Sequence, residues 1–390
     1  MKLLSCLKCN SFRMKNSLTK RILFIVISIL VLANVAVWVT DTTYIYKALI
    51  YQQPNIDDLE IFEHVSIENK GKKEPWNSSS TKNSVKLSDS LRHVLERYQT
   101  VAFLVIKNDS IQYEEYWDGY DENSSSNSFS VAKSIVGTLI GIAIDEGKIT
   151  SENDPVGKYV PEFNKGDLAK IKIVDVLKMA SGLNFHESYT TPFNQTTDAY
   201  YGSDLRKLIF SLKLEKEPGT EFTYKSGDTQ VLAFVLKAAT GKSISEYASE
   251  KLWSKIGAEN TAYWSLDHKG GDEKAYCCFY SNARDFARVG KLYMQNGMWD
   301  STQVVSSEWV KKATAPHGLP ENGVKTTQYG LQWWVYNDVY YCRGILGQYI
   351  ICDPTNNMIV VRLGKDRDKN KENNHPLDFL TYVSECRRLF

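Results

Sequence analysis

One segment of this chain limits its fold more than any other. Residues 129–144 read FSVAKSIVGTLIGIAI, and Lys133 is their only charged residue. The segment is apolar on nearly every side of a helix, which is typical of a helix buried at the centre of a domain. Ser130 and Lys133 lie on the same face, about one turn apart. A buried lysine without a partner tends to lose its proton, and a neutral amine could take a proton from the serine hydroxyl.

The pattern Ser-x-x-Lys is weak by itself. It occurs four times, starting at Ser5, Ser17, Ser79 and Ser130. The first two lie in a basic tail and the third in a polar run, where a lysine is simply solvated. Only Ser130 opens a buried helix. There too a structural explanation exists, with the serine as an N-cap and the lysine extending out of the first turn.

An apolar run near the N-terminus predicts a membrane anchor. Residues 1–21 hold six lysines and arginines and no acid, and residues 22–39 follow as an uninterrupted apolar stretch. A helix of that length is about 27 Å long, close to the thickness of a bilayer's hydrocarbon core. We predict a cytoplasmic basic tail at 1–21, a transmembrane anchor at 22–39 and a periplasmic or extracellular domain beyond it. A buried soluble helix and a cleaved signal peptide are the alternatives, although the bulky end at Val37–Val39 disfavours cleavage.

The composition describes an ordinary globular chain and excludes some partners. The 390 residues are 43% hydrophobic and 24% charged, with a net charge of +1, which is ample material for a core. Beyond the basic tail the chain is mildly acidic, so we expect no nucleic-acid partner. No histidine and cysteine spacing suits zinc, so we expect no metal. The sequence does not indicate an oligomeric state.

Five cysteines fall beyond the anchor, where disulfides persist. Because five is an odd number, at least one should stay free, and the pairing cannot be deduced from the sequence. The five are Cys277, Cys278, Cys342, Cys352 and Cys386.

Strand patterns occur at both ends of the remaining chain. Residues 101–107 and 111–117 predict a hairpin, and residues 331–341, 342–352 and 358–363 predict three late strands. Helical spacing is found at 90–98, 129–144, 173–181, 229–239, 243–256, 282–296 and 376–390. We predict an α+β domain over 89–390. In it, one antiparallel sheet built from both chain ends is flanked by helices and interrupted by a mostly helical region. Residues 40–88 are interpreted as a polar tether and lead-in.

Two loops are candidates for a site. Tyr224 and Ser226 follow a Pro-Gly turn and precede a helix, so both side chains could point into a cleft. A tyrosine beside an ammonium group can be driven toward phenolate and then act as general base and acid. Residues 184–204 form a long polar loop that includes Tyr189. Such a loop is often a lid or lines the substrate, and a plain surface crossing between helices is the alternative.

The order and setting of these motifs resemble the serine hydrolases of the β-lactamase-related, penicillin-binding-protein-like superfamily. Within it the chain is most similar to class C β-lactamases, esterases of that fold and 6-aminohexanoate-dimer hydrolases. The resemblance covers residues 99–389. The matching stretches are FSVAKS at 129–134, VLKMASGL at 176–183, PGT at 218–220, YKS at 224–226, DFARVG at 285–290 and YGLQW at 329–333.

The resemblance implies a role for each motif residue. Ser130 would be the nucleophile, Lys133 would lower its proton affinity, Tyr224 would exchange protons with the attacking and leaving groups, and Ser226 would extend the hydrogen-bond relay. An amide or ester carbonyl would form an acyl-enzyme that water resolves, with no cofactor. The N–H of Ser130 and one N–H of a late strand would hold the oxyanion.

One motif departs from the family pattern. The family has Lys-Thr-Gly or His-x-Gly on a late strand, whereas residues 342–348 here read CRGILGQ. Either Arg343 supplies the positive charge or Leu346 stands where the basic residue usually is. Gly347 and Gln348 are the candidates for the oxyanion strand.

Three functions follow from these motifs. The first is a membrane-anchored extracytoplasmic serine hydrolase acting on a small amide or ester. The second is a D-alanyl peptidase or β-lactamase, which the missing Lys-Thr-Gly disfavours because that motif engages a substrate carboxylate. The third is a non-catalytic binding or sensor domain on the same fold. The joint presence of Ser130, Lys133 and Tyr224 argues against it.

Overall fold

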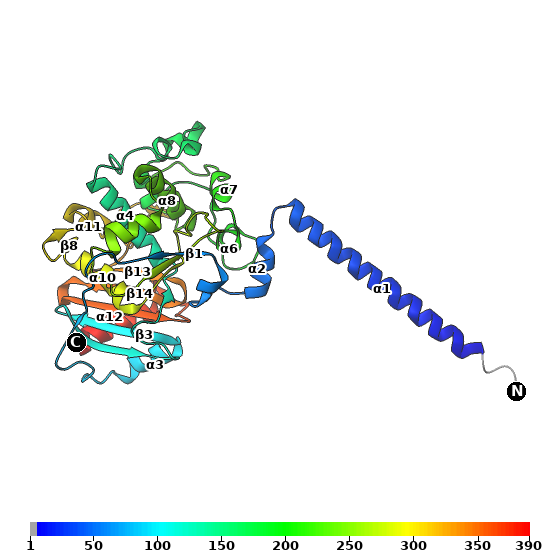
Figure 1. Ribbon diagram of the computed structural model, residues 1–390, viewed down its shortest axis with the longest axis horizontal. Helices are drawn as coiled ribbons and strands as arrows, with labels where there is room; N and C mark the ends of the chain where they lie inside the picture. The colour runs from blue at the N-terminus through cyan, green and yellow to red at the C-terminus, as the bar shows by residue number, and fades with distance from the viewer. Residues whose placement is uncertain (1–5) are drawn as a thin grey trace.

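The computed structural model describes residues 6–390. Residues 1–5 of the predicted basic tail, Ser5 among them, lie outside that range. Helix α1, Cys6–Val39, projects away from the body of the molecule (Figure 1). Within residues 6–390 it contains the one stretch long and apolar enough to cross a membrane, Leu18–Val39, and none of its most apolar window is buried. That exposure argues against the alternative of a soluble core helix.

The central sheet has seven strands in the order β12-β13-β14-β15-β3-β4-β2. Their bounds are β2 Asn77–Ser78, β3 Thr100–Lys107, β4 Ser110–Tyr116, β12 Trp334–Tyr336, β13 Val339–Gly344, β14 Gln348–Asp353 and β15 Met358–Gly364. Every pair is antiparallel except β2 with β4. Strand β15 pairs with β3, with Val360 opposite Val105. The prediction of one sheet built from both chain ends is confirmed.

The sheet is covered on both faces. Ala102, Leu104 and Ile106 of β3 belong to the core that contains α4 and α10, whereas Phe103 and Val105 pack with α3 and α12. This alternation follows from the period of two along a strand. The covering helices are α3 Asp89–Arg97, α4 Val131–Asp145, α10 Ala283–Met294 and α12 Leu377–Leu389.

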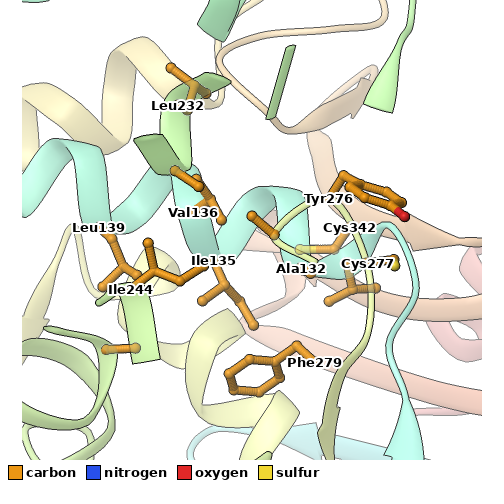
Figure 2. Close-up of a cluster of buried hydrophobic side chains, with 14 of the residues drawn as sticks. Ala132, Ile135, Val136, Leu139, Leu232, Ile244, Tyr276, Cys277, Phe279 and Cys342 are labelled. Atoms are coloured by element: carbon orange, nitrogen blue, oxygen red, sulfur yellow. The ribbon is translucent and has the colours of Figure 1, made fainter. Parts of the chain in front are cut away.

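The inserted region is mostly helical, and α4 lies at its centre. Its helices are α5 Ile173–Leu177, α6 Gln195–Tyr201, α7 Leu205–Phe210, α8 Ser226–Thr240 and α9 Ile244–Ala248. Side chains from Val131 to Ala143 are all buried. Helix α4 packs against α8, and Figure 2 shows Val136 of α4 on the side toward Leu232 of α8 and Ile135 on the side toward Phe279. The apolar helix predicted around Lys133 is therefore a core helix.

A smaller sheet and one further helix complete the domain. The small sheet has the strand order β1-β6-β7-β5. Its bounds are β1 His64–Ile67, β5 Ser126–Asn127, β6 Ala262–Ser265 and β7 Phe279–Ser281, and the further helix is α11 Ser307–Ala313. Strand β5 leads directly into the loop before Ser130, so the small sheet fixes the start of α4.

The late strands differ from the predicted ones. There are four rather than three, because a turn at Asn337 and Asp338 divides the predicted strand 331–341 into β12 and β13. Asn337 has φ 52°, the left-handed conformation that asparagine tolerates in tight turns. A short 3-10 turn, Ile345–Gly347, then interrupts the predicted strand 342–352.

Part of the predicted lead-in is folded onto the body. Helix α2, Tyr44–Tyr51, packs against α6, and β1 pairs with β6. Ile45, Ile56 and Phe62 are buried. Some apolar residues of this stretch thus dock, whereas Leu49, Ile50 and Tyr51 stay exposed. Helix α6 likewise lies in the loop 184–204, where we expected no helix.

Candidate active site

The amine of Lys133 is the centre of the site. Its Nζ donates hydrogen bonds to Ser130 Oγ at 3.1 Å, to Ser226 Oγ at 3.1 Å and to the carbonyl oxygen of Tyr276 at 2.8 Å. The residue is only 1% exposed. An ammonium group has three donors, and here each has one acceptor. Ser130 is the N-cap residue of α4, so helix geometry alone brings it to the lysine.

Burial and a nearby carboxylate shift the pKa of Lys133 in opposite directions. Burial lowers the pKa of Lys133 to about 8, and the negative charge of Glu187 partly counters this by raising it. A buried site disfavours the ammonium form because the charge loses its hydration. Near pH 8 about half of the molecules therefore hold a neutral amine beside the Ser130 hydroxyl.

Tyr224 contacts the same serine. Its hydroxyl hydrogen-bonds the side chain of Ser130, which lowers the pKa of Tyr224, but burial has the larger effect and raises it. Lys133 Nζ lies 5.3 Å from the centroid of the Tyr224 ring, so the cation is over the ring face. The sequence left open that a neighbouring ammonium group drives Tyr224 toward phenolate, whereas burial favours the protonated phenol in the resting site.

Glu187 orients Ser226. The carboxylate accepts the Ser226 N–H at 2.7 Å, the Ser226 hydroxyl at 2.9 Å and the Tyr189 hydroxyl at 2.5 Å. Ser226 is the first residue of α8, where the helix dipole favours a negative group. With its proton directed at Glu187, the Ser226 oxygen is free to accept from Lys133. Sequence reasoning missed Glu187, because a single acid in a polar loop carries no motif.

Two cavities meet at the nucleophile. The first, which we call the apolar chamber, has a volume of about 420 Å³, and the second, the cationic chamber, about 270 Å³. Four residues line both: Ser130, Glu187, Tyr189 and Ile345. Further walls of the apolar chamber include Ala48, Leu49, Pro54, Phe129, Tyr200 and Tyr201. A substrate carbonyl at Ser130 would therefore have space on both sides.

Three basic residues line the cationic chamber, namely Arg343, Arg367 and Lys371. The Arg343 guanidinium lies 3.5 Å from the centroid of the Trp334 ring and donates to a backbone carbonyl. Nη1 of Arg367 is buried without a hydrogen-bond partner. In the part of the chain that the structure describes, none of the three forms an ion pair. Glu187 and Glu321 also line this chamber, so three basic residues against two acids leave it a net positive charge, which favours an anionic ligand group.

The late-strand residues predicted for the oxyanion do not reach the chambers. Gln348 is fully buried, and its amide is hydrogen-bonded to Gly364 within the sheet. Gly347 packs against the Arg362 guanidinium. Ile345 lines both chambers together with Ser130 instead, because β13 ends at Gly344, earlier than we assumed. Register along a strand cannot be fixed without knowing where the strand turns.

A glycine permits this approach. A Cβ on Gly344, the last residue of β13, would lie 2.3 Å from the backbone oxygen of Ser128. Only a residue without a side chain lets the strand end come so close to the loop before Ser130. Leu346, the other candidate for the position of the missing basic residue, packs against the core instead.

A disulfide joins two adjacent residues beside the site. Cys277 and Cys278 are bonded to each other, and Cys277 lines the apolar chamber. The carbonyl that accepts from Lys133 belongs to the preceding residue, Tyr276. The other three cysteines beyond the anchor, Cys342, Cys352 and Cys386, are free and buried. No cluster of histidine, cysteine, aspartate or glutamate within residues 6–390 could hold a metal ion.

Comparisons with known proteins match this region of the chain. The family model described as Beta-lactamase matches residues 87–382. The chain is 30% identical over 310 residues to a 6-aminohexanoate-dimer hydrolase of Paenarthrobacter ureafaciens, covering 74% of this chain and 78% of that protein.

Two proteins of lower sequence identity are also similar to this chain. A protein of Escherichia coli strain K12, provisionally named a D-alanyl-D-alanine carboxypeptidase, is 22% identical over 350 residues, which are 68% of this chain and 78% of that one. A solved Bacillus anthracis structure, provisionally named a 6-aminohexanoate-dimer hydrolase, superposes with a TM-score of 0.74 at 23% identity. The match covers 86% of this chain and 92% of the other. At this identity the solved structure supports the fold.

Proposed function

The chain belongs to the Beta-lactamase family of serine hydrolases, and we propose that it cleaves a small amide or ester through an acyl-enzyme on Ser130. One observation supports this most strongly. The Lys133 amine lies 3.1 Å from the Ser130 hydroxyl oxygen, in a site where burial lowers its pKa to about 8. A neutral amine at that distance can take the hydroxyl proton as the oxygen attacks a carbonyl.

In acylation, Lys133 is the base and Tyr224 the acid. The Ser130 oxygen forms a bond to the carbonyl carbon while its proton passes to the Lys133 amine. When the tetrahedral intermediate collapses, the bond to the leaving group breaks, and the leaving nitrogen or oxygen takes the proton of the Tyr224 hydroxyl. An acyl-enzyme, a Lys133 ammonium and a Tyr224 phenolate remain. The ammonium favours the phenolate, since it lies over the same ring.

Deacylation reverses both proton transfers. The Tyr224 phenolate takes a proton from a water molecule whose oxygen attacks the acyl carbon. As the Ser130 ester breaks, the Lys133 ammonium returns its proton to the serine oxygen. Both residues then recover their resting states. Ser226, held by Glu187, keeps the Lys133 amine in place throughout.

The oxyanion would be held by two backbone N–H groups, those of Ser130 and Ile345. Two observations support Ile345. It follows the end of β13, and it lines both chambers together with Ser130. Donors fixed in the backbone stabilise a developing charge without reorganisation. The close contact that Gly344 makes possible sets their separation.

The positive charge of the missing family motif comes from Arg343 and its neighbours in this proposal. Arg343, Arg367 and Lys371 would hold an anionic part of the substrate in the cationic chamber. The same chamber supports a second candidate function, a D-alanyl peptidase or β-lactamase, because those substrates carry a carboxylate. A relative with that provisional name adds to it.

We also propose that the domain at 89–390 is held outside the cytoplasm by α1. The exposed apolar face of Leu18–Val39 supports a membrane anchor. The basic residues before it favour a cytoplasmic N-terminus. The hydrolase would then act in the periplasm or outside the cell, on a substrate available there.

A substrate panel on the detergent-solubilised full chain separates the candidates. p-Nitrophenyl esters, short amino-acid amides and a chromogenic cephalosporin would be tested for turnover, and a labelled penicillin for a mass adduct. Turnover of esters or amides is expected. A penicillin adduct with cephalosporin turnover would favour the second candidate. Inertness to every reagent would leave a binding domain and overturn both.

A further inference from the structure

Helix α2 is attached directly to the end of the anchor. Only residues 40–43 separate it from α1. The hydroxyl of Tyr46 donates a hydrogen bond to Asn34 Oδ1 at 2.8 Å, and Val37 packs against the core cluster to which α2 contributes. Helix α2 therefore lies beside the last turns of α1, and no flexible linker separates the two.

This attachment sets the depth of α2 relative to a bilayer. Asn34 lies five residues before the end of the span at Val39, which is about 7.5 Å along a helix. With the span in the hydrocarbon core, the Tyr46 hydroxyl that reaches Asn34 lies in the outer part of that core. Helix α2 then lies at the boundary between the core and the headgroup layer, which is about 5–7 Å thick.

Large apolar side chains are exposed around that level. We call Leu49, Ile50, Tyr51 and Phe193 the apolar collar. Ile50 is 71% exposed and Phe193 68%. Phe193 lines a surface cavity together with Thr40–Tyr44, so it lies beside the exit of the anchor. Aliphatic and aromatic residues of this kind are typical of a membrane–water interface.

The apolar chamber opens at the same place. Its lining includes the exposed Leu49 of the collar and the neighbouring Ala48 and Pro54, as well as Ser130 and the buried Phe129. Tyr200 of α6 contributes to the wall between them. The apolar chamber thus extends from the predicted lipid surface to the nucleophile. Because α2 is attached to the anchor, the distance between the bilayer and Ser130 is fixed.

We propose that the substrate is an amphiphilic ester or amide resident in the membrane, and that its alkyl chain enters the apolar chamber from the bilayer past α2. The surface that covers the apolar collar is the bilayer that holds α1. The inference rests on the proposed hydrolase function and on the anchor. It adds the source of the substrate and the chemistry of its acyl part.

The first test measures how deeply α2 lies in the bilayer. The full chain would carry Cys6→Ser, Cys9→Ser and Ile50→Cys, with an environment-sensitive fluorophore on the new thiol, in phosphatidylcholine vesicles. Quenching by lipids spin-labelled near the headgroup is expected at position 50. Val324→Cys is the matched control, since Val324 is equally exposed on a hairpin whose Glu321 lines the cationic chamber and not the apolar one, and it should not be quenched. Absence of quenching at position 50 would overturn the placement of α2.

The second test measures turnover of esters of increasing chain length in the same vesicles. Each additional buried methylene should raise kcat/KM about fourfold until the chamber is filled. The double variant Ile50→Ser/Phe193→Ser should lose about tenfold on the long-chain ester dispersed in the vesicles. It should keep its rate on a short soluble ester, because neither residue lines the apolar chamber. Val324→Ser should change neither rate.

The outcomes distinguish this inference from the proposed function. Turnover of short esters with no gain from chain length, or equal losses on both substrates in the double variant, would overturn the membrane-substrate inference and leave the hydrolase intact. Failure to hydrolyse any ester or amide would instead contradict the proposed function. Release of the chain from vesicles by alkaline carbonate would contradict the anchor.

Discussion

The carboxylate of Glu187 accepts both the backbone N–H and the hydroxyl of Ser226, at 2.7 Å and 2.9 Å. This pair places a negative charge near the buried amine without an ion pair to it. The arrangement lets Glu187 tune the protonation of Lys133 through space, while Ser226 makes the direct contact. The proton chemistry of the site is therefore open to a test by pH.

The pH dependence of kcat/KM should follow the protonation of Lys133. Activity is expected to rise with pH through a midpoint near 8, because only the neutral amine can act as base and burial lowers the pKa of Lys133 to about 8. In Glu187→Gln the negative charge that raises this pKa is gone, so the midpoint should move to lower pH. Glu215→Gln, which changes an exposed acid outside both chambers, should leave the midpoint in place. A midpoint unchanged in Glu187→Gln would refute the coupling.

Replacing Tyr224 by phenylalanine should separate amides from activated esters. Tyr224→Phe keeps the ring against Trp334 but removes the proton that the leaving group needs. Amide turnover should fall by about 10²–10⁴-fold, and p-nitrophenyl ester turnover much less, since nitrophenolate leaves without protonation. Tyr329→Phe, a neighbouring ring change outside both chambers, is the control. Equal losses on both substrate types would count against Tyr224 as the acid.

The buried core and the nucleophile pair could be predicted from the sequence, because they depend on local spacing. Ser130 and Lys133 are one helical turn apart, and the apolar run of α4 marks its burial. Tyr224 and Ser226 came from a second local motif. The contacts among these four residues depend on the fold, but each motif spans only a few residues and is therefore visible in the sequence.

Other parts of the site depend on long-range packing. Glu187 reaches Ser226 only because the loop 184–204 folds back over the start of α8. Ile345, and not Gly347 or Gln348, lines the chambers because β13 ends at Gly344, which lies close to Ser128, far away in the sequence. Helix α2 was missed because its eight residues are too few for a helical period to stand out in a polar segment, and the burial of Ile45 and Ala48 depends on contact with α6. None of these contacts leaves a periodic pattern.

Removing one guanidinium should weaken binding of anionic substrates. Arg367→Met keeps the aliphatic stem but removes the unpartnered Nη1 in the cationic chamber. For an ester that carries a free carboxylate, kcat/KM should fall about tenfold, the value of one hydrogen bond to a charged group. A neutral ester of the same length should be unaffected. Lys369→Met, two residues away and exposed, should change neither value, and an identical loss on both esters would argue against an anion site.

Breaking the Cys277–Cys278 disulfide should lower the pKa of Lys133, the proposed base. The bond between Cys277 and Cys278 fixes the loop whose preceding carbonyl, that of Tyr276, accepts from Lys133. Without that acceptor the ammonium form is less stabilised, so the pH midpoint should fall and turnover should drop severalfold. Rates of the wild-type chain with and without a phosphine reductant would be compared with those of Cys277→Ala/Cys278→Ala. The double variant should be insensitive to the reductant. A wild-type rate and pH midpoint that reduction leaves unchanged would show that the bond does not support the site.

The most direct test of the account is the identity of the acylated residue. The full chain would be treated with a fluorophosphonate, and the modified peptide located by mass spectrometry. We expect one adduct, on Ser130, which is lost in Ser130→Ala and strongly slowed in Lys133→Met. It should be retained in Ser79→Ala, which removes another serine of the same Ser-x-x-Lys pattern. An adduct on any other residue, or one that persists in Ser130→Ala, would contradict Ser130 as the nucleophile.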